Sequence, residues 1–267
     1  MSERARVVSA PAARPRSPLA DTATMVRRSL QLSLRNPEAM ITAVLLPAMI
    51  MLLFVYLFGG AIRTPTTYVN YVVPGVLLLC TSMVSAQTAV GVTQDMAGGV
   101  MDRFRSLDVG GPAVLSGHVA ASVARNTCAV AVMLAVAALI GFRPAAGALD
   151  WLVAGGVLLL YVLALSWVSA AFGLVVRSPE GANGFGFFVM FLPYPSSGFV
   201  PVETMPGWLH GFAEHQPATP VIEALRGSLL DTTATAHGAT ASAVVWCLGL
   251  TAVGVTASAA LFRRRTG

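Results

Sequence analysis

The stretch QDMAGGVMDRFRSL, residues 94–107, is a charged island in an otherwise apolar chain. It carries two aspartates and two arginines, whereas only 11% of the 267 residues are charged and 55% are hydrophobic. The mean hydropathy of the chain is +0.72. A soluble domain needs a more polar surface than this, so the composition predicts that a lipid bilayer forms part of the solvent.

Long stretches without any charged residue lie on both sides of the island and recur toward the C-terminus. The hydrocarbon core of a bilayer is roughly 30 Å thick and takes about 20 apolar residues as one helix. The pattern therefore predicts an all-α, polytopic transmembrane domain over residues 21–267. Residues 1–20, rich in Ala, Arg, Pro and Ser, are expected to be a disordered cytoplasmic tail. We expect six transmembrane helices, over residues 39–60, 71–93, 118–141, 151–176, 184–200 and 238–262.

The placement of the basic residues predicts the orientation. All 17 are arginines. If both termini are cytoplasmic, only Arg63, Arg143 and Arg226 lie on the outer side, which is a strong positive-inside bias. The net charge of +5 is therefore interpreted as a signal of membrane orientation, and a nucleic-acid partner is not expected.

Two segments outside the spans have helical patterns of their own. From Asp21 the apolar residues recur every four positions with arginines between them, which predicts a short N-terminal helix in the inner interface. After the fifth span, the chain is apolar but interrupted by Pro206, Pro217 and Pro220. We expect this outer stretch, with Glu203 at its start and Glu223 near its end, to form two short helices in the outer leaflet. Trp208 is expected at headgroup depth.

The charged island itself has an apolar face if it is helical. Met96, Val100, Phe104 and Leu107 are spaced so that they share one side. The topology places this helix in the cytoplasm. It is either a helix on the membrane surface or a plug for the groove of a soluble partner, with Phe104 as the anchor.

Several function classes are excluded or disfavoured. A P-loop needs a lysine that the chain does not contain, so ATP is not bound and hydrolysed here in the usual way. No acidic pair or metal-binding motif points to a membrane enzyme, and no metal site is expected. None of the six spans carries a charged residue at its centre, so the energy for transport is expected to come from outside this chain.

With catalysis and metal binding disfavoured, the remaining role for side chains in the spans is to line a passage for a transported substrate. Gln87 is the most central polar side chain, and the fifth span is rich in aromatic residues. Contacts with a hydrophobic or amphipathic substrate are one interpretation, and plain helix packing is the other. The candidate residues for the passage are Gln87, Phe187, Phe188, Phe191 and Tyr194.

Two motifs carry a resemblance to a known family. DMAGGVMDRFRSLDVGGPAVLSGHVAA, residues 95–121, and SSGFVPVETMPGWLHGFAEHQPATPVIEALRG, residues 196–227, resemble permeases of the second type of ATP-binding cassette (ABC) exporter, in the daunorubicin-resistance-like group. The resemblance implies six spans, cytoplasmic ends, an N-terminal interfacial helix and an outer re-entrant helical hairpin. One departure is Pro193-Tyr194-Pro195, whose second proline alters the expected geometry of the fifth span.

The resemblance also implies roles and partners. By the resemblance, the charged segment of residues 94–107 corresponds to the coupling helix that contacts the ATPase subunit. Its residues would be Asp95, Met96, Gly99, Val100, Arg103, Phe104, Arg105 and Leu107. Two ATPase subunits, which bind ATP and Mg, would work with two permease chains, expected to be a homodimer in the bacterial plasma membrane. The expected function is export of drug-, antibiotic- or lipid-like compounds. The alternatives are export of a lipid or polysaccharide precursor and, from another class, a membrane-embedded enzyme.

Overall fold

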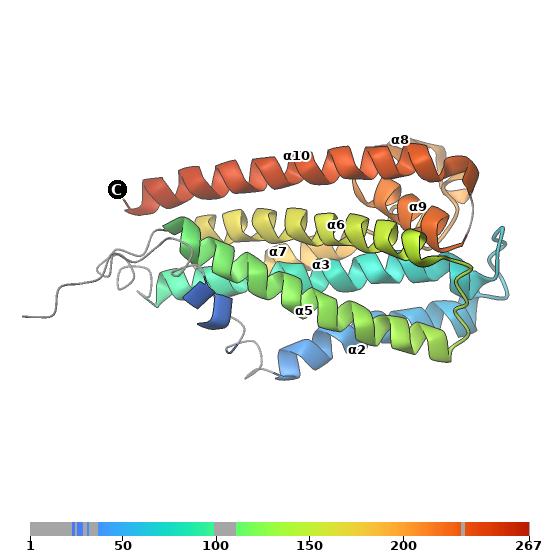
Figure 1. Cartoon of the computed structure of the whole chain (residues 1–267), viewed down its shortest axis with the longest axis horizontal. Helices are drawn as coiled ribbons and strands as arrows, with labels where there is room; N and C mark the ends of the chain where they lie inside the picture. Colours follow the sequence, from blue (N-terminus) through green and yellow to red (C-terminus); the bar gives the residue numbers. More distant parts are fainter. Residues whose placement is uncertain are drawn as a thin grey trace, which may run out of the picture.

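The computed structural model describes residues 23, 24, 26–28, 31, 37–98, 111–230 and 233–266. Within these residues the chain forms helices and turns and no β-strand, in agreement with the all-α prediction. Figure 1 shows the long helices lying roughly side by side, with α8 and α9 at one end. The elements are α2 (Pro37–Leu53), the π-helix η1 (Phe54–Phe58), α3 (Tyr68–Ala97), α5 (Gly111–Leu139), α6 (Ala148–Val175), α7 (Pro179–Phe191), the 3₁₀ turn η2 (Val202–Thr204), α8 (Gly207–His215), α9 (Ala218–Leu229) and α10 (Thr233–Thr266).

Helix α3 lies at the centre of the bundle. It contacts α2, α5, α6, α7 and α9, and α6 packs in turn against α10. Leu77 and Leu78 on α3 and Tyr161 on α6 are among the largest fully buried side chains and belong to one core cluster. The core is therefore built around the second of the expected spans.

Small polar side chains join α3 to its neighbours. The hydroxyls of Ser82 and Tyr161 are 2.9 Å apart, and Asn126 Nδ2 on α5 donates to Ser85 Oγ over 3.2 Å. A Cβ at Gly173 on α6 would lie 2.6 Å from a backbone oxygen of α3, so only glycine allows this approach. Small residues and interhelical hydrogen bonds are the usual means by which membrane helices pack closely.

Local signals fix several helix ends. The Ser178 hydroxyl accepts a hydrogen bond from the Gly181 N–H at 3.3 Å, and Pro179 follows it at the first position of α7. The Asp150 carboxylate accepts from the Gly147 N–H at 2.9 Å at the start of α6. Gly141, with φ of +108°, ends the turn after α5 in a conformation that favours glycine.

Five described helices are long and apolar enough to cross a membrane. They run over Ile41–Phe58, Tyr68–Ala97, Val114–Leu139, Ala148–Val175 and Gly238–Arg264. They cover all the expected spans except residues 184–200. Helix α5 starts at Gly111, before the third expected span, and its first turns lie near the charged end of α3, where His118 meets Asp95.

The predicted fifth helix was wrong in its boundaries. Helix α7 starts at Pro179 and ends at Phe191, and residues 192–200 form turns rather than helix. Pro193 and Pro195 remove two backbone donors within three residues, which favours the end of the helix at this point. The turns are nevertheless largely buried, and Phe199 is 1% exposed.

The second of the expected outer helices corresponds to α9, and it packs against the long helices. All residues of α9 except Glu223 are buried, and α9 contacts α3, α6 and α10. Its polar face carries Arg226, which finds partners inside the protein. Helix α8, by contrast, is mostly exposed, and Trp208 is 81% exposed.

Two predicted features lie wholly or partly outside the described residues. They are the cytoplasmic tail, residues 1–20, and most of the coupling segment, namely Gly99, Val100, Arg103, Phe104, Arg105 and Leu107. Of the predicted N-terminal helix, residues 23, 24, 26–28 and 31 are described, and they are helical.

Candidate functional site

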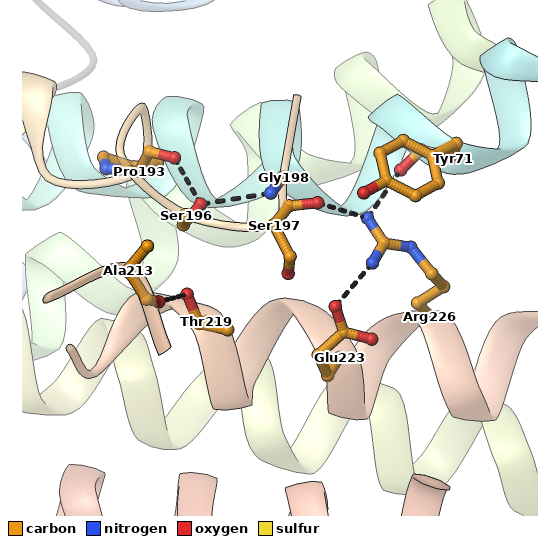
Figure 2. A network of polar contacts seen from close by, with 9 residues as sticks. All are labelled: Tyr71, Pro193, Ser196, Ser197, Gly198, Ala213, Thr219, Glu223 and Arg226. Carbon is orange, nitrogen blue, oxygen red and sulfur yellow. Dashed lines mark hydrogen bonds and ion pairs between the residues drawn. The ribbon is translucent and has the colours of Figure 1, made fainter. Parts of the chain in front are cut away.

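A buried arginine organises the end of the bundle that holds α8 and α9 (Figure 2). Arg226 on α9 is 8% exposed. Its Nη1 lies 2.7 Å from Glu223 Oε1, and its Nη2 donates to the carbonyl oxygens of Ser197 at 2.8 Å and Tyr71 at 3.1 Å. The guanidinium carbon also lies 3.9 Å from the centre of the Tyr71 ring. One side chain thus joins α9, α3 and the turns after α7.

The turns after α7 receive hydrogen bonds from several elements. Besides Arg226, the Gln216 side chain donates to the Pro195 carbonyl at 2.7 Å, and the Tyr68 hydroxyl donates to the Phe199 carbonyl at 3.0 Å. The Ser196 hydroxyl donates to the Pro193 carbonyl and accepts from the Gly198 N–H (Figure 2). Non-helical backbone is tolerated at membrane depth only where protein or water satisfies it. Here protein side chains do so.

Close packing holds the same turns against α3. A Cβ on Gly75 would lie 2.7 Å from the Gly198 backbone, and a Cβ on Gly198 would meet the Gly75 backbone at 3.0 Å. Two glycines from distant parts of the sequence therefore allow the two backbones to touch.

The structure places the residues predicted for the outer hairpin in or beside three different elements, η2, α8 and α9. Glu203 lies in η2, Pro206 precedes α8, and Trp208 projects from α8. Pro217 precedes α9, and Pro220 is buried within it. Glu223 forms an ion pair with Arg226. The partners Tyr71, Gln216 and Arg226 were not among the predicted site residues. An arginine in an apolar helix was the available signal.

The residues predicted to line a passage are mostly exposed. Phe187 and Phe188 are 64% and 72% exposed, and Gln87 and Phe191 are exposed as well. Gly186 on α7 packs against Ala86 on α3. Phe187 and Gln87 are the next residues along these two neighbouring helices. Phe187 and Phe191 meet edge to face at 4.9 Å.

Tyr194 connects this aromatic row to the buried turns. Its ring lies 5.6 Å from Phe191 and stacks on Phe199 at 5.0 Å. We define the aromatic face as Gln87, Phe187, Phe188, Phe191 and Tyr194.

An ion-pair cluster occupies the other end of the bundle. Asp95, in the last turns of α3, accepts hydrogen bonds from Arg28 Nη1 at 2.9 Å and Arg28 Nη2 at 3.0 Å. His118 Nε2 on α5 lies 3.0 Å from the same carboxylate. The hydrogen bond to Asp95 raises the pKa of the Arg28 guanidinium, which therefore stays charged at physiological pH. The carboxylate thus links the N-terminal segment, α3 and α5.

Asp95 and Met96 are the only predicted coupling residues that the described part of the chain includes. Both belong to α3, because this helix continues to Ala97. The side chain of Asp95 is 12% exposed. Its described contacts are thus within the chain.

One expectation about the spans was wrong. Arg125 lies midway along α5, so a charged residue does occur within a candidate span. Its Nη2 is 3.5 Å from Thr88 Oγ1 on α3. A guanidinium keeps its proton under physiological conditions and does not serve as a proton carrier. An energy source outside the chain therefore remains the expectation.

Comparisons with known proteins agree with this architecture. A profile described as ABC-2 type transporter matches residues 21–230. The chain is similar to the daunorubicin resistance ABC transporter permease protein DrrB1 of Streptomyces coeruleorubidus, with 34% identity over 230 residues, 85% of this chain and 81% of the relative. It is also similar to the probable doxorubicin resistance ABC transporter permease protein DrrC of Mycobacterium tuberculosis, with 24% identity over 211 residues, 78% of this chain and 76% of the relative.

Proposed function

Because the chain belongs to the ABC-2 type transporter family as a DrrB-like membrane permease, we propose that it works with a separate ATPase subunit to export hydrophobic or amphipathic compounds. The names of the relatives record resistance to daunorubicin and doxorubicin. For this chain they support a drug-like substrate. The permease itself performs no bond chemistry in this proposal.

The proposed topology has six crossings with both termini in the cytoplasm. Five are the long helices, and the remaining one is α7 together with residues 192–201. Contacts along α3 support this path: Gly186 meets Ala86 near the middle of α3, and Gly198 meets Gly75 near its outer end. The chain therefore passes along α3 as half helix and half buried turns.

The aromatic face is the observation that carries the proposed transport role. An exposed phenylalanine is ordinary in contact with lipid, but an amide such as Gln87 loses its hydrogen bonds in hydrocarbon. Gln87 is exposed on the single chain. A second copy of the permease placed against this face would cover Gln87 and leave an aromatic-lined passage between the copies. Such walls suit an apolar or amphipathic solute.

The proposed coupling to the ATPase uses the segment that follows α3. Asp95, held by Arg28 and His118, fixes the root of this segment. Arg103, Phe104, Arg105 and Leu107 would contact the ATPase subunit, with Phe104 as the anchor. Truncation of a central aromatic anchor typically costs about 2 kcal/mol or more of binding free energy.

The test is reconstitution of the permease and its cognate ATPase subunit in proteoliposomes. Lipophilic drugs should stimulate ATP hydrolysis, and sugars and amino acids should not. Phe104→Ala should abolish this stimulation and weaken capture of the ATPase subunit. Phe212→Ala, on the exposed outer helix α8, is the matched aromatic control. Stimulation only by small, highly charged solutes, or normal export by Phe104→Ala, would contradict the proposal.

A further inference from the structure

A pocket of about 650 Å³ opens at the outer end of the molecule. It lies between the turn after η1, the outer end of α3, residues 197–204 and the two helices α8 and α9. Its apolar wall includes Pro65, Val202 and Leu230. This volume is in the range of sites that hold organic ligands.

The charged groups around the pocket leave an excess of carboxylates. Glu203, Glu214 and Glu223 line it, together with Arg63 and Arg226. Arg226 and Glu223 are paired at 2.7 Å, and the guanidinium is also engaged by two carbonyls and a tyrosine ring. Of the remaining charged groups among the described lining residues, Glu203 and Glu214 are exposed, and Arg63 is the single cation beside these two carboxylates. A ligand in the pocket therefore meets net negative charge.

A buried hydroxyl in the wall also lacks a partner. Ser197 is 5% exposed and lines the pocket, and its Oγ has no hydrogen-bond partner among the described residues. Figure 2 shows this side chain turned toward α9, away from the direction in which the Ser197 carbonyl meets Arg226. A buried hydroxyl without a partner destabilises the folded state, and a polar group of a ligand would supply the missing hydrogen bond.

The carboxylates do not suit a metal ion. In the described part of the chain, no group of three or more His, Cys, Asp or Glu side chains is placed to hold one. Carboxylates spread around a partly apolar pocket suit an organic cation instead, because its apolar body contacts the wall while its charge stays near the glutamates.

We propose that this pocket binds the cationic group of an amphipathic substrate at the outer end of its path. The inference rests on the proposed export function and adds the charge of the substrate to it. Glu203 and Glu214 attract the cation, and the Ser197 hydroxyl bonds a polar group beside it. The Arg226 network holds the wall in place.

The test measures occupancy of the pocket in the full-length permease, without the ATPase subunit. Thr204→Cys, at the pocket rim, is introduced after replacement of Cys80, Cys128 and Cys247, and the protein is placed in lipid nanodiscs. The labelling rate with an uncharged polyethylene glycol maleimide is then followed. Benzyltrimethylammonium should slow the labelling, and benzenesulfonate, an anion with the same ring, should not.

Variants at the two exposed glutamates show whether charge is responsible. Glu203→Gln with Glu214→Gln should weaken protection by the cation about tenfold, as expected for loss of two nearby charges. Glu203→Lys with Glu214→Lys should shift protection to benzenesulfonate. Glu180→Gln, which removes an exposed carboxylate at the start of α7, should keep the original protection.

Equal protection by both ions, or protection unchanged in the double glutamine variant, would overturn the inference. Because this measurement needs neither ATP nor transport, its failure is separate from failure of the proposed function. Protection by the cation supports the pocket even if the reconstituted pair shows no drug-stimulated hydrolysis, a result that would refute only the export proposal.

Discussion

Helices α3 and α2 reverse the relation between hydrophobicity and burial that holds in soluble proteins. The window in α3 has a mean hydropathy of 1.6, the lowest of the five candidate spans, yet 83% of it is buried. The window that starts in α2 has the highest value, 2.5, and only 17% of it is buried. Lipid tails are as apolar as leucine, so apolar surface has no reason to leave them. In this pair of helices, small and polar groups rather than apolar area accompany the burial of α3.

The side chains of the two helices agree with this rule. Ser82 and Ser85 of α3 bond to Tyr161 and Asn126 on α6 and α5. Helix α2 exposes its leucines, for example Leu45 at 56%. Gln87 is a polar side chain that α3 leaves exposed. Because its amide would lose hydrogen bonds in lipid, we expect another polar surface or a second chain to cover it.

The largest loss of stability is expected at the arginine that anchors α9 to α3. Arg226→Met leaves the carbonyls of Ser197 and Tyr71 without their donor and Glu223 without its partner. The free energy of unfolding should fall by about 3–4 kcal/mol, measured by unfolding with sodium dodecyl sulfate in mixed micelles. Arg63→Met, at an exposed arginine on the same side, is the control. Equal stability of the two variants would show that the network is dispensable.

Two leucine substitutions compare how much the buried helix α3 and the exposed helix α2 contribute to the free energy of unfolding. Leu78→Ala, at a fully buried position of α3, should lower the free energy of unfolding by about 2 kcal/mol through lost packing. Leu45→Ala on α2 replaces contacts with lipid and should change it by less than about 0.5 kcal/mol. Similar losses in the same micelle assay would mean that α2 is covered by protein in the isolated chain.

A glycine pair measures the close contact between α3 and the turns after α7. Gly75→Ala places a methyl group 2.7 Å from the Gly198 backbone, so the backbones must separate. We expect a loss of about 1–2 kcal/mol in the free energy of unfolding. Gly155→Ala on α6 is matched to it, because nothing lies within 4 Å of its added Cβ. A destabilisation confined to Gly155→Ala would be incompatible with this packing.

The smallest effect is expected at the charged end of α3. Asp95→Asn weakens the contacts with Arg28 and His118 and should lower the free energy of unfolding by about 1 kcal/mol, since the ion pair is partly exposed. Faster tryptic cleavage near Arg28 would report release of the N-terminal segment. Glu180→Gln, at an exposed carboxylate, is the control. Unchanged cleavage would show that Asp95 does not hold this segment.

Charge-free stretches predicted the long helices well, because one physical requirement, a hydrocarbon thickness, sets their length. They could not predict the end of α7 at Phe191. Residues 192–200 are apolar enough to suggest a span, and only the partners from α3, from α9 and from Gln216 before α9 show how their backbone is satisfied.

The hydrogen-bond network around Arg226 could not be predicted for a similar reason. Arg226 was counted as an outer charge. The two backbone carbonyls that its side chain contacts belong to residues 155 and 29 positions away in the chain. Periodicity in α9 revealed an apolar face, but burial of the opposite face depends on tertiary contacts. The aromatic face was chosen from the sequence as the most central polar side chain and the aromatic side chains of the fifth span. The structure brings Phe187, Phe191 and Tyr194 into ring contact, and their role in a passage stays a prediction.

The aromatic face provides the most direct test of the central claim that a polar group exposed from the core helix marks the passage. Gln87→Cys and Phe188→Cys are compared with Leu45→Cys and Val253→Cys, which are exposed on α2 and α10. All four are made after replacement of the three native cysteines and reconstituted with the ATPase subunit. During ATP turnover, a polar, membrane-impermeant thiol reagent should label the first two positions and leave the other two unlabelled. Labelling of Leu45→Cys or Val253→Cys alone, with Gln87→Cys and Phe188→Cys unreactive throughout, would contradict the account.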